Sequence, residues 1–171
     1  DAMRLSEVKV TGMILESKAE EKADTLHTVA VSRRKQVAEA IPSVNIIGVS
    51  KNKKSLALGG LGNVVREKAY GLQIGGLYNH VGDIGRGVAI AGLANTTLGS
   101  YYGVQLGGLW NYTSHDTKGV MIGGLANWVN SGFDGLQLGG LANITRDARA
   151  IQVAGLTNIS KGLYGIQISG L

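Results

Sequence analysis

The chain has 171 residues, 44% of them hydrophobic, and a formal net charge of +5 at pH 7. It contains no cysteine, which excludes a disulfide framework and a thiolate metal site, and its 27 glycines recur at fixed places, which excludes a flexible linker. The basic residues have no aromatic stacking platform beside them, so nucleic acid is not expected as a partner. A solvated face or a face near anionic lipid is the expectation for these residues, which gather at Arg33–Lys35, Lys51, Lys53–Lys54 and Arg66.

Residues 1–42 carry no repeat, and we expect them to form a mixed α/β cap on the array that follows. Apolar and polar residues alternate over Leu5–Gly12, which predicts a strand, and Leu26–Val31 predicts a second one. A short helix is expected over residues 32–40, with a serine as its N-cap, and Pro42 ends it because the residue before a proline avoids the helical region.

Leu5–Gly12, with the sequence LSEVKVTG, resembles the segment that begins the plug of TonB-dependent outer-membrane proteins of Bacteroidetes. The resemblance covers about eight residues. It implies an association with the outer membrane.

A unit of about 16 residues organises residues 43–171. Its clearest copies are GLQIGGLYN at residues 71–79, GVQLGGLWN at 103–111 and GLQLGGLAN at 135–143. Copies begin at residues 55, 71, 87, 103, 119, 135, 150 and 165, after a shortened first copy at 43–54. A fixed short period is the mark of a repeat architecture, and here it predicts a parallel β-solenoid with one copy per coil.

The copies also resemble a family of surface repeat proteins of Bacteroidetes and Leptospira, over residues 55–171. This resemblance implies a protein of the bacterial cell envelope, at the outer membrane or the cell surface. It implies no catalytic residue.

Numbering the places of a copy from its first residue separates the faces that we expect. The second and fourth places are always aliphatic and are predicted to point into the core, and the third place is predicted to point outward. A glycine at the sixth place is expected to bend the chain, so that the leucine of the seventh place points inward again. Small or β-branched residues at the eleventh place suit the opposite wall of a narrow core.

The ninth place holds asparagine in every copy that reaches it. Stacked parallel coils would set each of these side chains on the previous one, which predicts an amide ladder and explains why the residues are identical. The ladder residues are Asn63, Asn79, Asn95, Asn111, Asn127, Asn143 and Asn158.

The alternative architecture is an antiparallel β-barrel of the outer membrane, or a fragment of one, serving as a pore or TonB-linked receptor. In that case the second, fourth, eighth and tenth places face lipid, and the glutamines and asparagines face the lumen. The interface aromatics would be Tyr78, Trp110, Tyr112 and Trp128.

No shared spacing links the titratable side chains. His27, His80 and His115 take different places in or outside the copies, so no metal ligands and no cofactor are expected. The aspartates of the variable loops, among them Asp116 and Asp134, would carry the chemistry of a third class, a solenoid enzyme acting on carbohydrate. The expectation is a protein without enzymatic activity.

Exposed aromatic residues are the candidate contact points for a protein or glycan at the cell surface, namely Tyr78, Trp110, Tyr101 and Tyr102. The last copy, Gly165–Leu171, stops within a unit and is expected to leave a sheet edge through which chains self-associate or further coils continue. The sequence therefore predicts a surface scaffold or adhesion element.

Overall fold

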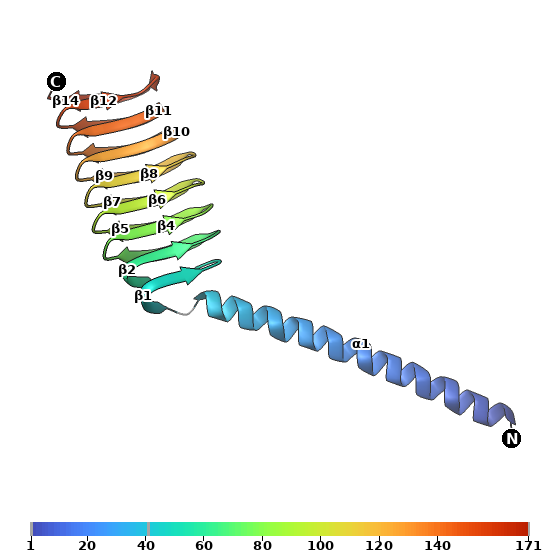
Figure 1. The fold of residues 1–171 in the computed structure, drawn as a ribbon. Helices are drawn as coiled ribbons and strands as arrows, with labels where there is room; N and C mark the ends of the chain where they lie inside the picture. The colour runs from blue at the N-terminus through green and yellow to red at the C-terminus, as the bar shows by residue number, and fades with distance from the viewer. Residues whose placement is uncertain (1, 41, 171) are drawn as a thin grey trace. The chain divides into compact units, whose positions relative to one another are not determined.

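The computed structural model describes the backbone of residues 2–40 and 42–170 and the side chains of residues 16–34, 36 and 42–170. The chain divides into two compact units, Asp1–Glu39 and Ala40–Leu171. The first unit is helical, and the second is a stack of β-coils (Figure 1).

One helix, α1 (Ala2–Ala40), replaces the two strands expected over residues 5–12 and 26–31, so the prediction of an α/β cap was wrong in its secondary structure. The central run of Glu, Lys and Ala residues favours a helix, and a helix once nucleated extends through its β-branched flanks at one hydrogen bond per residue. Thr25 Oγ1 donates to the Glu21 carbonyl oxygen over 2.8 Å, which fits threonine into the helix interior. The helix ends at Ala40, before Pro42, as predicted. Within the part of the chain that the structure describes, no helix has the length and apolarity needed to span a membrane.

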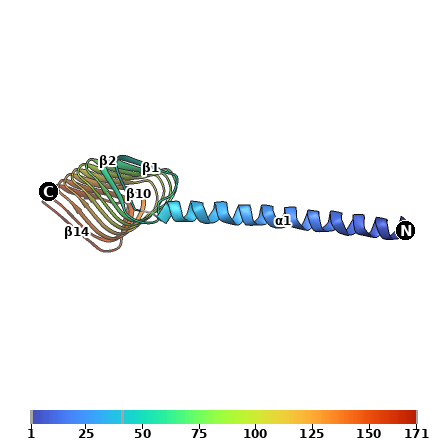
Figure 2. The same cartoon turned by 90° about the horizontal axis from the view of Figure 1, so that it is seen from below.

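The second unit is a parallel β-solenoid of about eight turns, with coils of about 16 residues, as the repeat predicted. Every strand pair that the structure describes is parallel, so the antiparallel alternative was wrong. Figure 2 looks roughly along the stack and shows the coils lying over one another. The strands are β1 (Ser43–Ser50), β2 (Ala57–Val65), β3 (Ala69–Gly75), β4 (Tyr78–Val81), β5 (Gly85–Ala91), β6 (Ala94–Thr97), β7 (Tyr101–Gly107), β8 (Trp110–Thr113), β9 (Thr117–Gly123), β10 (Ala126–Gly139), β11 (Ala142–Ala154), β12 (Thr157–Ile159), β13 (Gly162–Leu163) and β14 (Ile166–Ser169).

Each coil has two walls and two turns. Strands β3, β5, β7 and β9 follow one another on the first wall, and β4, β6 and β8 on the second, while β10 and β11 run from the second wall of one coil into the first wall of the next. The register advances by one copy per coil, so Leu72 pairs with Val88 and Asn79 pairs with Asn95. Like residues therefore stack in columns along the solenoid.

The core faces are the reverse of those predicted from the aliphatic pattern. The third-place residue Gln105 is 1% exposed, whereas the seventh-place residue Leu125 is 43% exposed and the fourth-place residue Ile122 is 39% exposed. The side chains of the third, fifth, ninth and eleventh places point inward, and so does the residue that lies two positions before the start of the next copy. The second, fourth, eighth and tenth places lie outside, as the antiparallel alternative predicts. The strand directions of that alternative are wrong.

The bend between the walls explains this reversal. A Cβ atom on the fifth-place residue Gly75 would lie 2.2 Å from the Tyr78 carbonyl oxygen and 2.8 Å from Asn79 Oδ1. The fifth place therefore faces the crowded inside of the bend and accepts only a very small residue. Since side chains alternate along a strand, the third place must also point inward and the second and fourth places outward.

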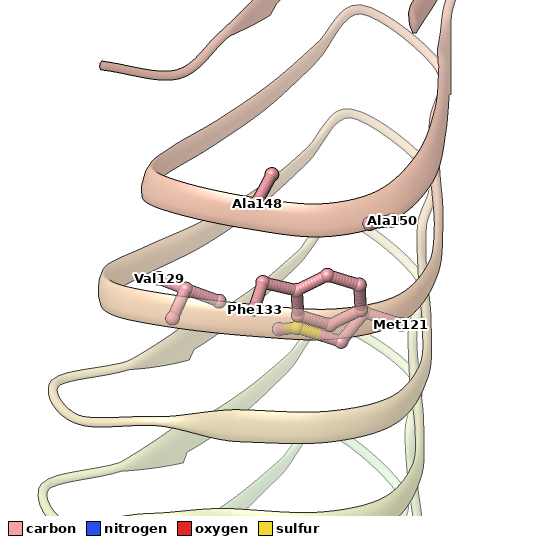
Figure 3. Close-up of a cluster of buried hydrophobic side chains, with 5 residues drawn as sticks. All are labelled: Met121, Val129, Phe133, Ala148 and Ala150. Carbon is pink, nitrogen blue, oxygen red and sulfur yellow. The ribbon is translucent and has the colours of Figure 1, made fainter. Parts of the chain in front are cut away.

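Apolar side chains fill the interior where the polar columns are interrupted. Met121, Val129, Phe133, Ala148 and Ala150 form one buried cluster inside successive coils (Figure 3). The Phe133 ring lies between Thr117 and Ala148, its partners in register. Large and small residues thus alternate along the column, which keeps the core of this narrow solenoid filled.

Candidate functional site

The asparagine ladder is continuous from Asn63 to Asn158. Asn79 Nδ2 donates to Asn95 Oδ1 over 2.9 Å and to the Ile90 carbonyl oxygen over 2.8 Å, and the same pair of bonds recurs at each step. The six members from Asn63 to Asn143 are at most 1% exposed. The predicted ladder is therefore confirmed, and it ties each coil to the next with two hydrogen bonds from every amide.

A second polar column, which the aliphatic pattern predicts on the outside, runs through the third place inside the solenoid. Gln152 Nε2 donates to Gln137 Oε1, and Gln167 Nε2 donates to Gln152 Oε1 over 2.7 Å. Gln105 instead bonds the eleventh-place hydroxyls of Thr97 and Thr113, at 3.3 and 3.4 Å. The fifth-place glycine was the signal in the sequence that could have found this column.

The outside of the solenoid is apolar over three adjoining surfaces. We call the second- and fourth-place columns the aliphatic face, the seventh-place leucines the leucine edge, and the eighth- and tenth-place columns the aromatic face. The leucine edge lies at the turn between the other two. The exposed leucine-edge residues are Leu61, Leu77, Leu93, Leu125, Leu141 and Leu156.

Charged residues take the opposite side of each coil. From residue 55 onward, every Asp, Glu, Lys and Arg follows the eleventh place of its copy, so the aliphatic face, leucine edge and aromatic face contain none. These residues lie at the second turn of each coil and at the start of the next first-wall strand, a region that we call the loop edge. The solenoid is thus amphipathic across its width.

The aromatic face holds four of the aromatic residues that the sequence analysis names. Trp110 and Trp128 are 48% and 49% exposed, and the Trp128 ring meets the Tyr112 ring edge to face with centroids 6.4 Å apart. Asn130 joins this pair, since its Oδ1 accepts from Trp128 Nε1 over 2.7 Å and its Nδ2 donates to the Tyr112 hydroxyl over 2.9 Å. Tyr78 is half-buried on the same face.

Tyr101 and Tyr102 point in opposite directions. Tyr101 is 3% exposed, and burial raises the pKa of its hydroxyl, so its prediction as a surface contact was wrong. Tyr102 lies outside, where the Arg86 guanidinium stacks 5.1 Å from its ring centroid and 6.0 Å from that of Tyr70. Strand alternation, which turns neighbouring residues to opposite faces, separates the two tyrosines.

The aspartates meet at a groove on the loop edge. It has a volume of about 480 Å³, and its lining includes Asp116, Asp134, Asp147, Arg149 and Tyr164. Asp116 Oδ1 accepts from Ser131 Oγ over 2.7 Å and from the Gly132 amide over 3.0 Å, and these bonds lower the pKa of Asp116. The sequence did not predict this meeting, because the residues take different places in copies of unequal length.

The two histidines of the solenoid have different neighbours. His80 Nδ1 lies 2.9 Å from Thr96 Oγ1 on the aromatic face, His115 Nδ1 lies 3.0 Å from the Leu98 carbonyl oxygen, and His27 belongs to α1. Among the described residues, no three His, Asp or Glu side chains lie close enough to hold a metal ion.

These features define a parallel β-solenoid with an internal amide ladder and an apolar exterior. In comparisons with family models, curated proteins and solved structures, no match to this chain was found.

Proposed function

We propose that this chain is a non-enzymatic module of the bacterial cell envelope, a scaffold that binds through its apolar outer surface. The observation that carries the proposal is the distribution of side chains between the inside and the outside of the coils. Amide side chains fill the inside, whereas leucine, isoleucine and tryptophan side chains lie outside. A large exposed apolar surface is typical of a site of interaction with a protein, a membrane or another ligand. The resemblance of the repeat to surface repeat proteins supports the envelope as its place.

The ladder supports the scaffold role. Because every buried asparagine bonds both the next asparagine and a carbonyl of the next coil, the coils are held at a fixed spacing. Outer side chains are therefore presented in a regular array at about 4.8 Å per coil. The pore and receptor alternative has less support, since the solenoid interior is filled by side chains such as Gln137 and Asn127, both 0% exposed.

Binding to isolated envelopes tests the proposal. Purified chain is incubated with envelope fractions of the source bacterium, and the bound share is measured after sedimentation. We expect saturable binding that falls at least tenfold in a variant carrying Leu93→Gln, Leu125→Gln and Ile122→Gln. The matched control, Arg146→Gln with Lys161→Gln, changes exposed loop-edge residues and should bind as the wild type does. Equal binding of both variants, or none by the wild type, would contradict the proposal.

The loop-edge groove favours a second candidate, a glycan ligand. Tyr164 is 82% exposed and offers a ring for stacking, while Asp134 and Arg149, which pair in register, offer polar groups to sugar hydroxyls. Binding of envelope polysaccharide measured by calorimetry should be lost in Tyr164→Ala and kept in Tyr112→Ala, which changes the aromatic face. The same affinity for both variants would exclude this site.

A further inference from the structure

We propose that the partner of the apolar outer surface is a phospholipid bilayer, which the solenoid enters with its leucine edge foremost while its loop edge stays in water. This inference rests on the proposed function and names the partner class. The shape, the charge distribution and the dimensions of the coils support it.

The shape of the apolar surface favours a deformable partner. The aliphatic face and the aromatic face lie on two walls that meet at the leucine edge, so together they form a convex wedge. A rigid sheet of a second copy could cover only one wall. At about 4.8 Å per coil, the two aliphatic columns span roughly 35 by 12 Å, or about 400 Å², against about 800 Å² per partner in a stable protein interface. Acyl chains can cover both walls and the edge at once.

The charge distribution sets the orientation. The wedge holds no Asp, Glu, Lys or Arg from residue 55 onward, and burying such a charge among acyl chains would be costly. At the top of the aliphatic face, the last places of four successive copies bring tyrosines and cations into register, namely Tyr70, Arg86, Tyr102 and Lys118. Asp134 and Arg149 continue this column. Tyrosine and long cationic side chains are typical of the interface between acyl chains and water.

The dimensions agree with one leaflet. The first-wall strands end at the fifth place, three residues after the second, which at about 3.3 Å per residue gives roughly 10 Å of charge-free strand. The bend that carries the leucine edge adds to this depth. Half of a bilayer's hydrocarbon core is about 15 Å. Arg86, two residues before the second-place residue Val88, then lies roughly 7 Å further out, at the level of the headgroups. Headgroups of negative charge should therefore strengthen binding.

The two tryptophans of the chain report the insertion directly. Both lie on the aromatic face, Trp110 next to the leucine edge at the eighth place and Trp128 two residues further at the tenth. The full chain is mixed with two kinds of vesicle, one of phosphatidylcholine and an anionic one that also contains phosphatidylglycerol. We expect a blue shift of the tryptophan emission and quenching by brominated acyl chains. Two single-tryptophan variants separate the signals: Trp128→Phe keeps Trp110, and Trp110→Phe keeps Trp128. Trp110 should be quenched by bromines placed deeper in the bilayer than those that quench Trp128.

Flotation of the same vesicles gives the second measurement. Replacing Leu77, Leu93, Leu125 and Leu141 by Gln should abolish flotation with at least a tenfold loss of binding, while far-UV circular dichroism stays unchanged. Arg86→Gln with Lys118→Gln should keep binding to phosphatidylcholine and lose severalfold on the anionic vesicles. Arg146→Gln with Lys161→Gln is the control on the loop edge.

Three results would overturn the inference. The wild type floats with neither vesicle, or the leucine variant floats as well as the wild type, or Trp128 is quenched from greater depth than Trp110. If neither vesicle binds but envelopes still do, the proposed function stands and the partner is a protein or glycan. Self-association in sedimentation velocity that disappears in the leucine variant, without vesicle binding, would assign the surface to a second copy.

Discussion

Asn111 Nδ2 donates to Asn127 Oδ1 over 2.8 Å in the centre of the solenoid, and the same nitrogen donates to the Ile122 carbonyl oxygen over 2.8 Å. Asn111 also accepts, through its Oδ1, from Asn95 Nδ2 over 2.9 Å. One buried amide thus satisfies three groups on its neighbouring coils. Each such group, if left buried and unpaired, costs about 1–3 kcal/mol.

Asn111→Ala should therefore lower the free energy of unfolding by about 3 kcal/mol or more, because three buried groups lose their partner. Urea unfolding followed by tryptophan fluorescence reports on the solenoid, which contains both tryptophans. Asn158→Ala at the last, half-buried rung is the control and should cost about 1 kcal/mol, since water reaches the freed groups. Equal losses at the two rungs would show that the ladder does not stabilise the stack.

Gln105→Ala should cost more stability than Leu125→Ala. Gln105 is 1% exposed and bonds two threonine hydroxyls, so its truncation leaves a cavity and unpaired groups at about 2–4 kcal/mol. Leu125 is 43% exposed, and its truncation should cost about 0.5 kcal/mol. The same unfolding measurement compares them, and a larger loss at Leu125 would mean that the leucine edge, and not the third-place column, belongs to the core.

The period and the ladder could be predicted from the sequence because they depend only on identity between copies. A residue such as Asn95 that recurs at the same place must stack on its counterparts once the strands are parallel and in register. Whether a side chain points inward or outward depends instead on which of the two alternating sets of places in the strand faces the core. Leucine and isoleucine look like core residues, and only the steric demand at the fifth place shows that they lie outside.

Two other features could not be predicted from the sequence, the secondary structure of residues 5–31 and the loop-edge groove, and each has its own physical reason. Over residues 5–31, the alternation of apolar and polar residues favours strands, whereas the helix propensity of the neighbouring residues favours a helix. The structure has the helix α1 there. In the loop-edge groove, Asp116 and Asp134 are brought together by the stacking of loops that share no spacing. A site made by three-dimensional stacking of variable segments leaves no pattern in a single sequence.

Gly108→Ala should disrupt the stack. A Cβ atom at this sixth place would lie 1.9 Å from the Gly92 carbonyl oxygen of the previous coil, a backbone atom that can move only if the coils separate. We expect a loss of about 3 kcal/mol or more, or failure to fold, because overpacking against backbone exceeds the usual 1–3 kcal/mol. Gly132→Ala is the matched control, since its Cβ would lie 3.1 Å from the side chain of Asp116 and should change stability by about 0.5 kcal/mol. A folded Gly108→Ala protein of wild-type stability would contradict the proposed tight contact.

Acid should release the loop that Asp116 holds. Its bonds from Ser131 and Gly132 lower the pKa of this carboxyl in the folded chain, so its contribution is complete above the unfolded value of about 3.9 and is lost as the pH falls through the lower folded value. A carboxyl-detected NMR titration should place the pKa of Asp116 below the ordinary aspartate value of about 3.9. The Gly132 amide resonance should move with the same midpoint in the wild type and stay unchanged in Asp116→Asn. A midpoint at or above the ordinary aspartate value would contradict the hydrogen bonds.

Gln73→Met should stabilise the chain. Gln73 is 3% exposed, and neither its Nε2 nor its Oε1 has a hydrogen-bond partner among the residues that the structure describes, since Ala57 and Ala89 are its neighbours in register. A buried amide without partners costs about 1–3 kcal/mol, and an apolar side chain of the same shape recovers part of this. Met121 occupies the same column at 0% exposure, which shows that methionine fits there. Gln137→Met, which removes the acceptor of Gln152, is the control and should instead lose about 1–2 kcal/mol. Opposite signs in the unfolding free energy are expected, and a destabilised Gln73→Met protein would mean that this amide has a partner in solution.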